Sequence, residues 1–243
     1  GKMGAAILSS RACLRAGVGL LSTIVPNCGY EIIQESVPEA MAIPMGENVL
    51  AGTPQVSDKQ NAIGIGPGID TSEETAAFIE MLFRGSNCPL VIDADALNII
   101  SQQRELLQLV QGRAILTPHP KEFDRLTGES SSTFERIEKQ AALSKEHNIV
   151  VVLKGHHTSI SLPDGSVYFN TTGNPGMSTA GSGDVLTGVI LAFLAMGYAL
   201  VDAAKAGVYL HGLSGDLAAK EVGEVSMIAS DLIEYLPQAF QLT

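Results

Sequence analysis

The chain has 243 residues, and 45% of them are hydrophobic, which is enough to bury a complete α/β core without disulfides or structural metals. Its formal net charge of −11, without any cluster of lysine and arginine, argues against a nucleic-acid partner. No run approaches the roughly 18 consecutive apolar residues of a membrane span, and the first residues lack a secretory signal, so no membrane partner is expected.

The three cysteines, Cys13, Cys28 and Cys88, form an odd set without the spacing of metal ligands. We interpret them as reduced thiols, which indicates a cytoplasmic protein. The sequence shows no internal repeat, low-complexity tract or linker, so residues 1–243 are expected to form a single domain.

The first predicted helix covers residues 4–21, where apolar side chains recur at helical spacing until two glycines loosen its end. A short apolar strand is predicted at residues 62–65. It ends in the sharp turn Gly66–Gly68, and a second helix is predicted from about residue 72 to residue 83.

Two further apolar runs, residues 90–92 and 114–116, predict central strands that are buried on both faces, as in parallel sheets. Asp93 and Asp95 follow the first of these strands. If the strand continued, both side chains would point to the same face and suggest a metal site or a buried polar network. Asp95 is equally compatible with an N-cap for the next helix, starting at Ala96, and the sequence leaves both interpretations open.

The strand at 114–116 is followed by a histidine between two prolines. Pro118 and Pro120 exclude a regular helix or central strand at His119 and fix the local backbone. A histidine held in this way could bind a ligand, or it could hydrogen-bond its own loop. Glu122 then opens a predicted helix at 122–127, where a carboxylate is favourable.

The clearest strand lies at residues 149–153, after a polar helix at about 132–147. Lys154 and Gly155 follow it directly. A lysine beside a glycine at a strand end could meet nucleotide phosphates, or it could belong to a solvated turn. Residues 158–162 and 166–169 then flank a Pro-Asp-Gly turn and predict a β-hairpin.

The most informative stretch is residues 174–184, in which small residues lead to one carboxylate and an apolar helix at about 182–196. The first N–H groups of a helix lack partners and favour an anion. Gly181 and Gly183 would let the backbone approach phosphate oxygens, and Ser182 adds a hydroxyl donor. Asp184 could then orient or deprotonate an attacking hydroxyl. The alternative is an ordinary glycine-rich loop with a favourable first-turn acid.

Two more helices are predicted, at about 201–220 and 229–240. His147 and His211 are interpreted as surface or helix-packing residues. Asn170 and Asn174 flank a glycine turn and could hold the loop or reach a ligand.

The order of these elements indicates an α/β fold, with an antiparallel hairpin in a mostly parallel sheet. Open sheets of this kind bind ligands beyond the carboxyl ends of their strands. The chemically interesting segments all follow predicted strands, and we expect them to meet in one cleft. They are residues 66–68, 93–95, 117–122 and 154–158.

Taken together, these motifs resemble the NAD(P)H-hydrate dehydratase family, a carbohydrate-kinase-like branch of the ribokinase-like fold. The resemblance rests on Gly-Ala-Ala-Ile-Leu at 4–8, Ile-Gly-Pro-Gly-Ile at 65–69, Val-Ile-Asp-Ala-Asp-Ala-Leu-Asn at 91–98, Leu-Thr-Pro-His-Pro-Lys-Glu-Phe at 116–123, Leu-Lys-Gly-His-His-Thr at 153–158 and Gly-Ser-Gly-Asp at 181–184. Family members usually carry a strand and glycine-rich turn before the first motif. The sequence begins inside that turn, so this N-terminal strand is expected to be missing.

The resemblance implies a three-layer α/β/α ribokinase-like sandwich, with a mostly parallel central sheet and a C-terminal β-hairpin. It also implies ADP- or ATP-dependent dehydration of (S)-NAD(P)H hydrate: the ring hydroxyl is phosphorylated and then lost as phosphate, which restores NADH or NADPH. The implied cofactors are Mg²⁺ and the phosphoryl donor ADP (or ATP), and bacterial relatives typically prefer ADP. The implied partners are further copies of the chain, in a tetramer, and a fused or separate NAD(P)H-hydrate epimerase.

The resemblance further implies roles for individual residues. The catalytic set is Asp184, Gly181, Ser182 and Gly183. The NAD(P)H hydrate is expected to contact Ala5, Gly68, His119 and Asp184. The adenine nucleotide is expected to contact Lys154, Gly155, His156, His157, Thr158 and Gly183. Glu122 is expected to hold the metal through water.

Two other functions compete with this one. A kinase of the same fold that acts on a sugar, a vitamin alcohol or a thiazole ethanol would share residues 181–184. The motifs at 65–69, 91–98 and 116–123 favour the dehydratase. A nucleotide-sensing or scaffold protein that kept the pocket but lost turnover is the third possibility.

Overall fold

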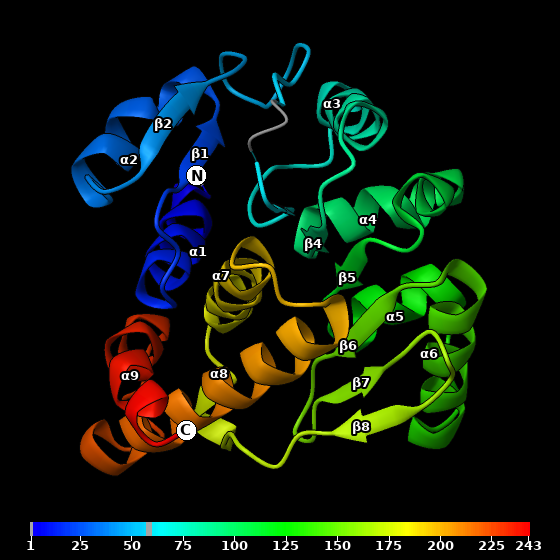
Figure 1. Cartoon of the computed structure of the whole chain (residues 1–243), viewed down its shortest axis with the longest axis vertical. Coiled ribbons are helices and arrows are strands. Elements are labelled where there is room, and N and C mark those ends of the chain that lie inside the picture. Colours follow the sequence, from blue (N-terminus) through cyan, green and yellow to red (C-terminus); the bar gives the residue numbers. More distant parts are fainter. Residues whose placement is uncertain (1, 57–59) are drawn as a thin grey trace.

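The computed structural model describes residues 2–56 and 60–243 (Figure 1). Its central sheet has six strands in the order β3-β4-β5-β6-β7-β8. The strands are β3 Ile63–Ile65, β4 Leu90–Ile92, β5 Ala114–Leu116, β6 Val150–Leu153, β7 Ser159–Ser161 and β8 Val167–Phe169. Strands β3 to β6 are parallel, whereas β7 and β8 are antiparallel to their neighbours, as the predicted hairpin requires.

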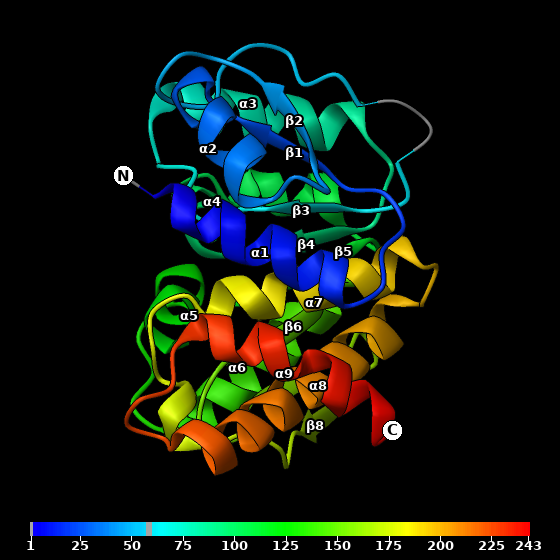
Figure 2. The same cartoon turned by 90° about the vertical axis from the view of Figure 1, so that its left-hand side faces the viewer.

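Helices cover both faces of this sheet (Figures 1 and 2). One layer contains α1 Met3–Arg15, α7 Ser182–Ala195, α8 Leu200–Val222 and α9 Ala229–Gln241. The other contains α3 Glu73–Gly85, α4 Ala94–Gln102, α5 Pro120–Thr127 and α6 Thr133–His147. Short 3₁₀ segments lie at Asn27–Gly29, Arg104–Val110 and Pro175–Met177.

The strand residues alternate between the two layers. Val91 and Ile115 pack into the core beneath α7 and α8, whereas Ile92 and Leu116 pack into the core beneath α3 to α6. Because both faces of the sheet are buried, its strands read as uninterrupted apolar runs rather than as alternating ones. The predicted three-layer α/β/α sandwich is therefore confirmed.

The N-terminal region differs from the prediction. The first helix ends at Arg15 rather than near residue 21, because Gly17 adopts a left-handed φ of 102° that stops it. The chain then forms three elements that the sequence did not predict: β1 Ser22–Val25, α2 Tyr30–Ser36 and β2 Met41–Pro44. Strands β1 and β2 pair in parallel as a separate two-stranded sheet, at the top of Figure 2.

Backbone hydrogen bonds bring the carboxyl ends of the parallel strands to one edge of the sheet. The N–H of Asp93 donates to Ile65 O (3.0 Å), that of Thr117 to Ile92 O (3.0 Å), and that of Lys154 to Pro118 O (2.9 Å). The segments that follow β3, β4, β5 and β6 therefore lie side by side, as the sequence predicted.

Two general features bear on the environment of the chain. Within residues 2–56 and 60–243, no helix is both long enough and apolar enough to traverse a bilayer. Cys13, Cys28 and Cys88 carry free thiols, and burial raises the pKa of the Cys13 thiol to about 12, so this cysteine is inert.

Candidate active site

The site is built around the N-terminus of α7. Gly181 precedes the helix with a φ of 90°, a left-handed conformation that only glycine adopts readily, and its missing side chain makes room for Leu8. Within the described residues, no side chain caps this helix start. The Ser182 N–H donates to Thr179 O at a long 3.4 Å, whereas no partner is found for the Gly183 N–H within the described residues. The helix start can therefore still receive an anion, and the helix dipole adds partial positive charge there.

Gly183 allows a cation to approach the same helix start. A Cβ at this position would lie only 3.1 Å from the ammonium nitrogen of Lys154. Because glycine carries no side chain, Lys154 lies against the first turn of α7. The positive end of the helix and the lysine charge act on the same small volume, which is an arrangement suited to a phosphate.

Asp93 anchors Lys154 from below. Its carboxylate is almost fully buried, with 1% of the residue exposed, and Oδ1 lies 2.7 Å from Lys154 Nζ. Thr187 Oγ1 donates to Oδ2 at 2.8 Å, and the Ala94 N–H donates to Oδ1 at 2.8 Å. Both carboxylate oxygens are thus satisfied, so this buried charge is compensated and the lysine is held in place.

The two acids after β4 behave differently from the prediction. Asp93, not Asp95, is the N-cap of α4, because the strand ends at Ile92 and the Asp93 side chain binds the first N–H of the helix. The shared face was expected only for a strand that continued through both acids, and β4 ends before them, at Ile92. Asp95 turns away to accept hydrogen bonds from Lys2 Nζ and the Asp70 N–H, each at 3.0 Å. The buried polar network that the sequence suggested forms around Asp93 alone.

Asp184 lies half-buried in the first turn of α7. In the described parts of the chain, no hydrogen bond or ion pair engages its carboxylate, although Asp93 and Lys154 lie close by. Burial, reinforced by the negative charge of Asp93 and opposed by Lys154, raises the pKa of Asp184 to about 6. A carboxyl group that titrates close to neutral pH is well matched to accepting a proton from a hydroxyl group.

His119 is the N-cap of α5, which begins at Pro120 rather than at Glu122. Its Nδ1 accepts hydrogen bonds from the N–H groups of Lys121 (3.1 Å) and Glu122 (3.3 Å). The Glu122 carboxylate in return accepts from the His119 N–H at 2.9 Å. His119 thus binds its own loop, which is one of the two interpretations that the sequence left open. Its side chain remains 44% exposed, and its Nε2 lies 3.2 Å from Glu122 Oε1.

The pKa values of this pair follow from their surroundings. Burial first, and then the positive charges of Lys154 and Arg125, lower the pKa of His119, which favours the neutral imidazole. Burial raises the pKa of Glu122, against the opposing effect of Lys154. Across residues 2–56 and 60–243, no three His, Cys, Asp or Glu side chains are arranged to hold a metal ion.

The loop between β6 and β7 is exposed. Gly155, His156 and His157 face solvent, and the two imidazole rings contact each other edge-on with centroids 4.3 Å apart. Thr158 Oγ1 donates to Gly155 O at 3.3 Å. Of the residues assigned to the nucleotide, Lys154 and Gly183 therefore meet, whereas residues 155–157 are exposed.

Ala5 and Gly68 are brought together by the packing of α1 on the turn after β3. A Cβ at Gly68 would lie 3.2 Å from the Ala5 Cβ and 2.8 Å from Lys2 O. The same end of α1 reaches the neighbourhood of α4, since Lys2 pairs with Asp95. The start of α1 and the turn after β3, both assigned to the hydrate, thus lie together at the carboxyl end of β3.

Two residues of the site were missed by sequence reasoning. Thr187 holds Asp93, as described above, and the available signal was a hydroxyl one turn after Asp184 in an otherwise apolar helix. His211 on α8 is buried, as the helix-packing interpretation held, but its Nε2 also lies 3.0 Å from the Ser182 carbonyl and 3.4 Å from Ser182 Oγ. Burial lowers the pKa of His211 to about 4, so a neutral imidazole supports the Gly-Ser-Gly-Asp segment.

The two asparagines hold the preceding loop. Asn170 donates to Thr172 O at 2.9 Å, and Asn174 donates to Asp216 at 3.1 Å while its Oδ1 accepts from the Gly176 N–H. Asn170 is thus used inside the loop that leads to Gly181, and Asn174 ties this loop to α8.

The layered fold and the uncapped helix start above the parallel strands define a ribokinase-like α/β protein. The family model described as NAD(P)H-hydrate dehydratase matches residues 1–238, and the chain belongs to this family.

Three similar proteins illustrate the relationship. The bifunctional NAD(P)H-hydrate repair enzyme of Moorella thermoacetica is 39% identical over 98% of this chain and 47% of its own length. The ADP-dependent (S)-NAD(P)H-hydrate dehydratase of Neisseria meningitidis is 36% identical over 92% of this chain and 75% of its own length. A crystal structure of the ADP/ATP-dependent NAD(P)H-hydrate dehydratase of Bacillus subtilis, co-crystallised with ATP and Mg²⁺, has a TM-score of 0.82 at 30% identity and covers 99% of this chain and 85% of that chain.

The chain spans about half the length of the bifunctional relatives that it matches, 47% in one and 48% in another.

Proposed function

We propose that the protein catalyses the ADP- or ATP-dependent dehydration of (S)-NAD(P)H hydrate to NADH or NADPH, a repair reaction of nicotinamide nucleotides. The observation that carries this proposal is the half-buried Asp184 carboxylate, free of partners in the described residues, beside Lys154 and the uncapped start of α7. The names of the relatives supply the substrate and the phosphoryl donor.

The chemistry needs a better leaving group than hydroxide. In the first step the ring hydroxyl attacks the terminal phosphorus of ADP, its proton passes to Asp184, and AMP leaves; with ATP, ADP leaves. In the second step the C–O bond breaks, phosphate takes the electron pair, and the lone pair of the ring nitrogen assists. Loss of a proton from the neighbouring ring carbon to water then completes the reduced nicotinamide.

The residues at the start of α7 suit the first step. The N–H groups of Gly181 and Gly183, and that of Ser182 once it leaves Thr179 O, would hold the transferring phosphoryl group. Lys154, fixed by Asp93, would add a positive charge at the same point. Except for the Ser182 N–H, these donors are in position before the ligand arrives, so little reorganisation accompanies the transfer. Asp184 stands next to them, as a base that takes up the hydroxyl proton must.

Mg²⁺, which fits a site of this kind, would offset the charge of the nucleotide phosphates. It commonly binds one or two carboxylates together with phosphate oxygens, so a complete protein cage is not needed. Asp184 is the observation that favours this metal, because its desolvated carboxylate lacks a full set of partners among the described residues. We assign Glu122 a contact through water, since its buried carboxylate lies at the same edge of the sheet.

We place the hydrate against Ala5, Gly68 and His119, and the adenine nucleotide against residues 154–158 and Gly183. The contact between Ala5 and Gly68 and the exposed imidazole of His119 support the first assignment. The approach of Lys154 to Gly183 supports the second.

The wider setting is also proposed. Residues 1–243 would form one domain, since two cores share a single sheet. The bifunctional relatives favour an NAD(P)H-hydrate epimerase as a fused or separate partner. We further propose a homotetramer in the cytoplasm, where free thiols such as those of the three cysteines persist.

One assay separates this function from its alternatives. The protein is given hydrated NADPH with ADP and Mg²⁺, and in parallel a panel of alcohols with ATP. Recovery of the absorbance of reduced nicotinamide, with one AMP formed per turnover, is the expected result. A phosphorylated alcohol without that absorbance would identify a small-molecule kinase, and nucleotide binding without any product would identify a sensing or scaffold protein.

A further inference from the structure

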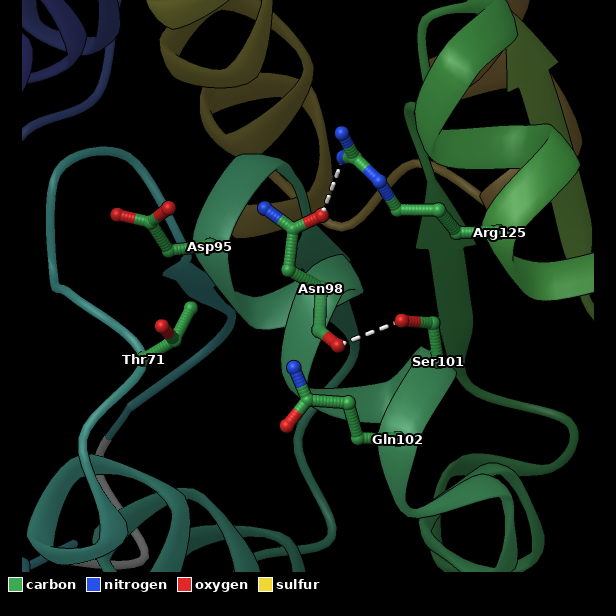
Figure 3. Close-up of a pocket in the computed structure, with 6 residues that line it drawn as sticks. All are labelled: Thr71, Asp95, Asn98, Ser101, Gln102 and Arg125. Atoms are coloured by element: carbon green, nitrogen blue, oxygen red, sulfur yellow. Dashed lines mark hydrogen bonds between the residues drawn. The ribbon is translucent and has the colours of Figure 1, made fainter.

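A polar hollow of about 290 Å³ lies beside the proposed hydrate site (Figure 3). It is lined by Thr71, Asp95, Asn98, Ser101, Gln102 and Arg125. The first of these follows the turn that contains Gly68, the next four belong to α4, and Arg125 belongs to α5, the helix that His119 caps.

Arg125 carries a positive charge that no carboxylate balances within the described residues. Its guanidinium donates to Asn98 Oδ1 at 2.8 Å, and Asn98 is neutral. In contrast, Arg136 pairs with Asp124 and Arg84 pairs with Glu80. Among the described contacts, Arg11 and Arg113 also donate only to neutral carbonyl oxygens, but Arg125 lines this hollow. A guanidinium has five N–H donors, and its planar fork matches phosphate oxygens.

The acid in the hollow does not cancel this charge. Asp95 accepts hydrogen bonds from Lys2 Nζ and from the Asp70 N–H, each at 3.0 Å. Figure 3 shows Asp95 and Thr71 on one side, Arg125 on the other, and Asn98 between them. The hollow therefore offers a guanidinium at one end and hydroxyl and amide groups along its wall, which suits a sugar phosphate.

The position of the hollow relates it to the substrate rather than to the phosphoryl donor. Gly68 lies two residues before Asp70, whose N–H binds Asp95 at the edge of the hollow. At the other end, the charge of Arg125 lowers the pKa of His119. The turn at Gly68 and the segment that begins at His119, both assigned to the hydrated nicotinamide, thus lead directly into the residues that line the hollow.

We propose that the hollow binds a phosphate-bearing part of the pyridine dinucleotide, remote from the reacting ring, and that Arg125 is its phosphate contact. The inference rests on the proposed function. The phosphate belongs either to the pyrophosphate, which NADH and NADPH share, or to the 2′-phosphate, which only NADPH carries. Asn98 orients the guanidinium toward it.

The test measures the dissociation constants of NADH and NADPH, the reaction products, by calorimetry with the wild-type protein and with Arg125→Gln. A charge-assisted contact to phosphate predicts that Arg125→Gln binds about 10-fold more weakly. An equal loss for both dinucleotides identifies the pyrophosphate, and a loss confined to NADPH identifies the 2′-phosphate. Arg84→Gln, which removes the same charge from an exposed helix, should bind both normally.

Asn98→Asp separates phosphate binding from a structural role of Arg125. This variant keeps the link between α4 and α5 and strengthens it, but it gives the guanidinium a carboxylate partner. Binding should therefore fall about as far as in Arg125→Gln. If only Arg125→Gln weakened binding, the contact between α4 and α5 would matter rather than the unpaired charge of Arg125. If both variants bound the dinucleotides normally, the hollow would not take part in binding. Either result overturns the inference alone, whereas a wild-type protein that binds neither dinucleotide overturns the proposed function as well.

Discussion

The two halves of the proposed nucleotide site are built in opposite ways. Beneath α7, the buried Asp93 pairs with the partly buried Lys154 and also accepts a hydrogen bond from Thr187, so the protein itself fixes these positions. In the loop after β6, residues 155–157 are exposed, and the two histidines contact each other. The first half would hold a phosphate without rearranging, whereas the second half is constrained by few contacts of its own.

We expect phosphoryl transfer to depend mainly on the first half, called the rigid half below, and less on the loop after β6. A transferring phosphoryl group is stabilised best by hydrogen-bond donors that are already oriented. Reorienting donors during the reaction costs free energy and would offset the stabilisation that they provide. A nucleoside needs only to be retained, and contacts from an exposed loop are sufficient for that. Substitutions beneath α7 should therefore have large effects, and substitutions in the loop small ones.

The largest effect is expected from Asp184→Asn. Loss of the group that accepts the hydroxyl proton should lower kcat by about 10²- to 10⁴-fold, while the dissociation constant of ADP changes little. Steady-state kinetics on hydrated NADPH and calorimetry with ADP measure the two quantities. A variant with near-normal kcat would remove Asp184 from its proposed role. In the wild type, kcat should also fall as pH drops below about 6, where Asp184 becomes protonated.

The second-largest effect is expected from Lys154→Met, which should lower the free energy of unfolding. The substitution leaves the buried Asp93 carboxylate without its cation, which typically costs about 3 kcal/mol of unfolding free energy. His156→Ala, two residues away but exposed, should change it by less than about 0.5 kcal/mol. Urea unfolding of both variants gives the comparison. Restoration of stability by a second change, Asp93→Asn, would attribute the loss to the unpaired charge; equal stabilities of the two single variants would contradict the rigid network.

Gly183→Val tests the anion site with a matched control. A branched side chain placed 3.1 Å from Lys154 Nζ must displace the ammonium group, so ADP affinity should fall by about 10-fold or more. A Cβ at Gly155 meets nothing within 4 Å, and Gly155→Ala should therefore bind ADP almost normally. Calorimetry distinguishes them. Similar affinities for the two variants would mean that the helix start does not hold the phosphate.

Much of the rigid half could be predicted from the sequence. Strands β4, β5 and β6 are buried on both faces, so their uninterrupted apolar runs are strong signals, and the glycine-rich segment before an apolar helix is equally distinctive. The half-exposed strands β1 and β2 gave no such pattern and were missed. The start of α4 lies two residues earlier than predicted because β4 ends at Ile92 and the Asp93 side chain accepts the Ala94 N–H. Ala94 itself adopts a φ of 47°, a conformation that the residue type does not indicate.

The contacts within the site could not be predicted in the same way. Thr187 meets Asp93 across 94 positions of the chain, and His211 meets Ser182 across 29. Such pairs depend on how α7 and α8 pack on the sheet, and no local pattern encodes that packing. The residue types were visible, but their partners required the fold.

The smallest effect expected is a pH-dependent gain of stability in Asp184→Asn. Burial raises the pKa of Asp184 from 3.8 to about 6, so the folded state binds this proton more tightly than the unfolded chain does. The contribution is therefore fully present below about pH 4 and is lost as the pH rises toward 6. At pH 7.5 the charged carboxylate costs stability, on the order of 1 kcal/mol after allowance for its partial exposure.

Asparagine carries no charge to bury, so the variant should unfold at a higher urea concentration than the wild type at pH 7.5 and at nearly the same concentration at pH 4. The same side chain would then be shown to lower stability and to support turnover, which is the behaviour expected of a functional group in an otherwise satisfied network. A gain of equal size at both pH values would mean that shape rather than charge is responsible, and that the carboxylate of Asp184 is not strained by its surroundings.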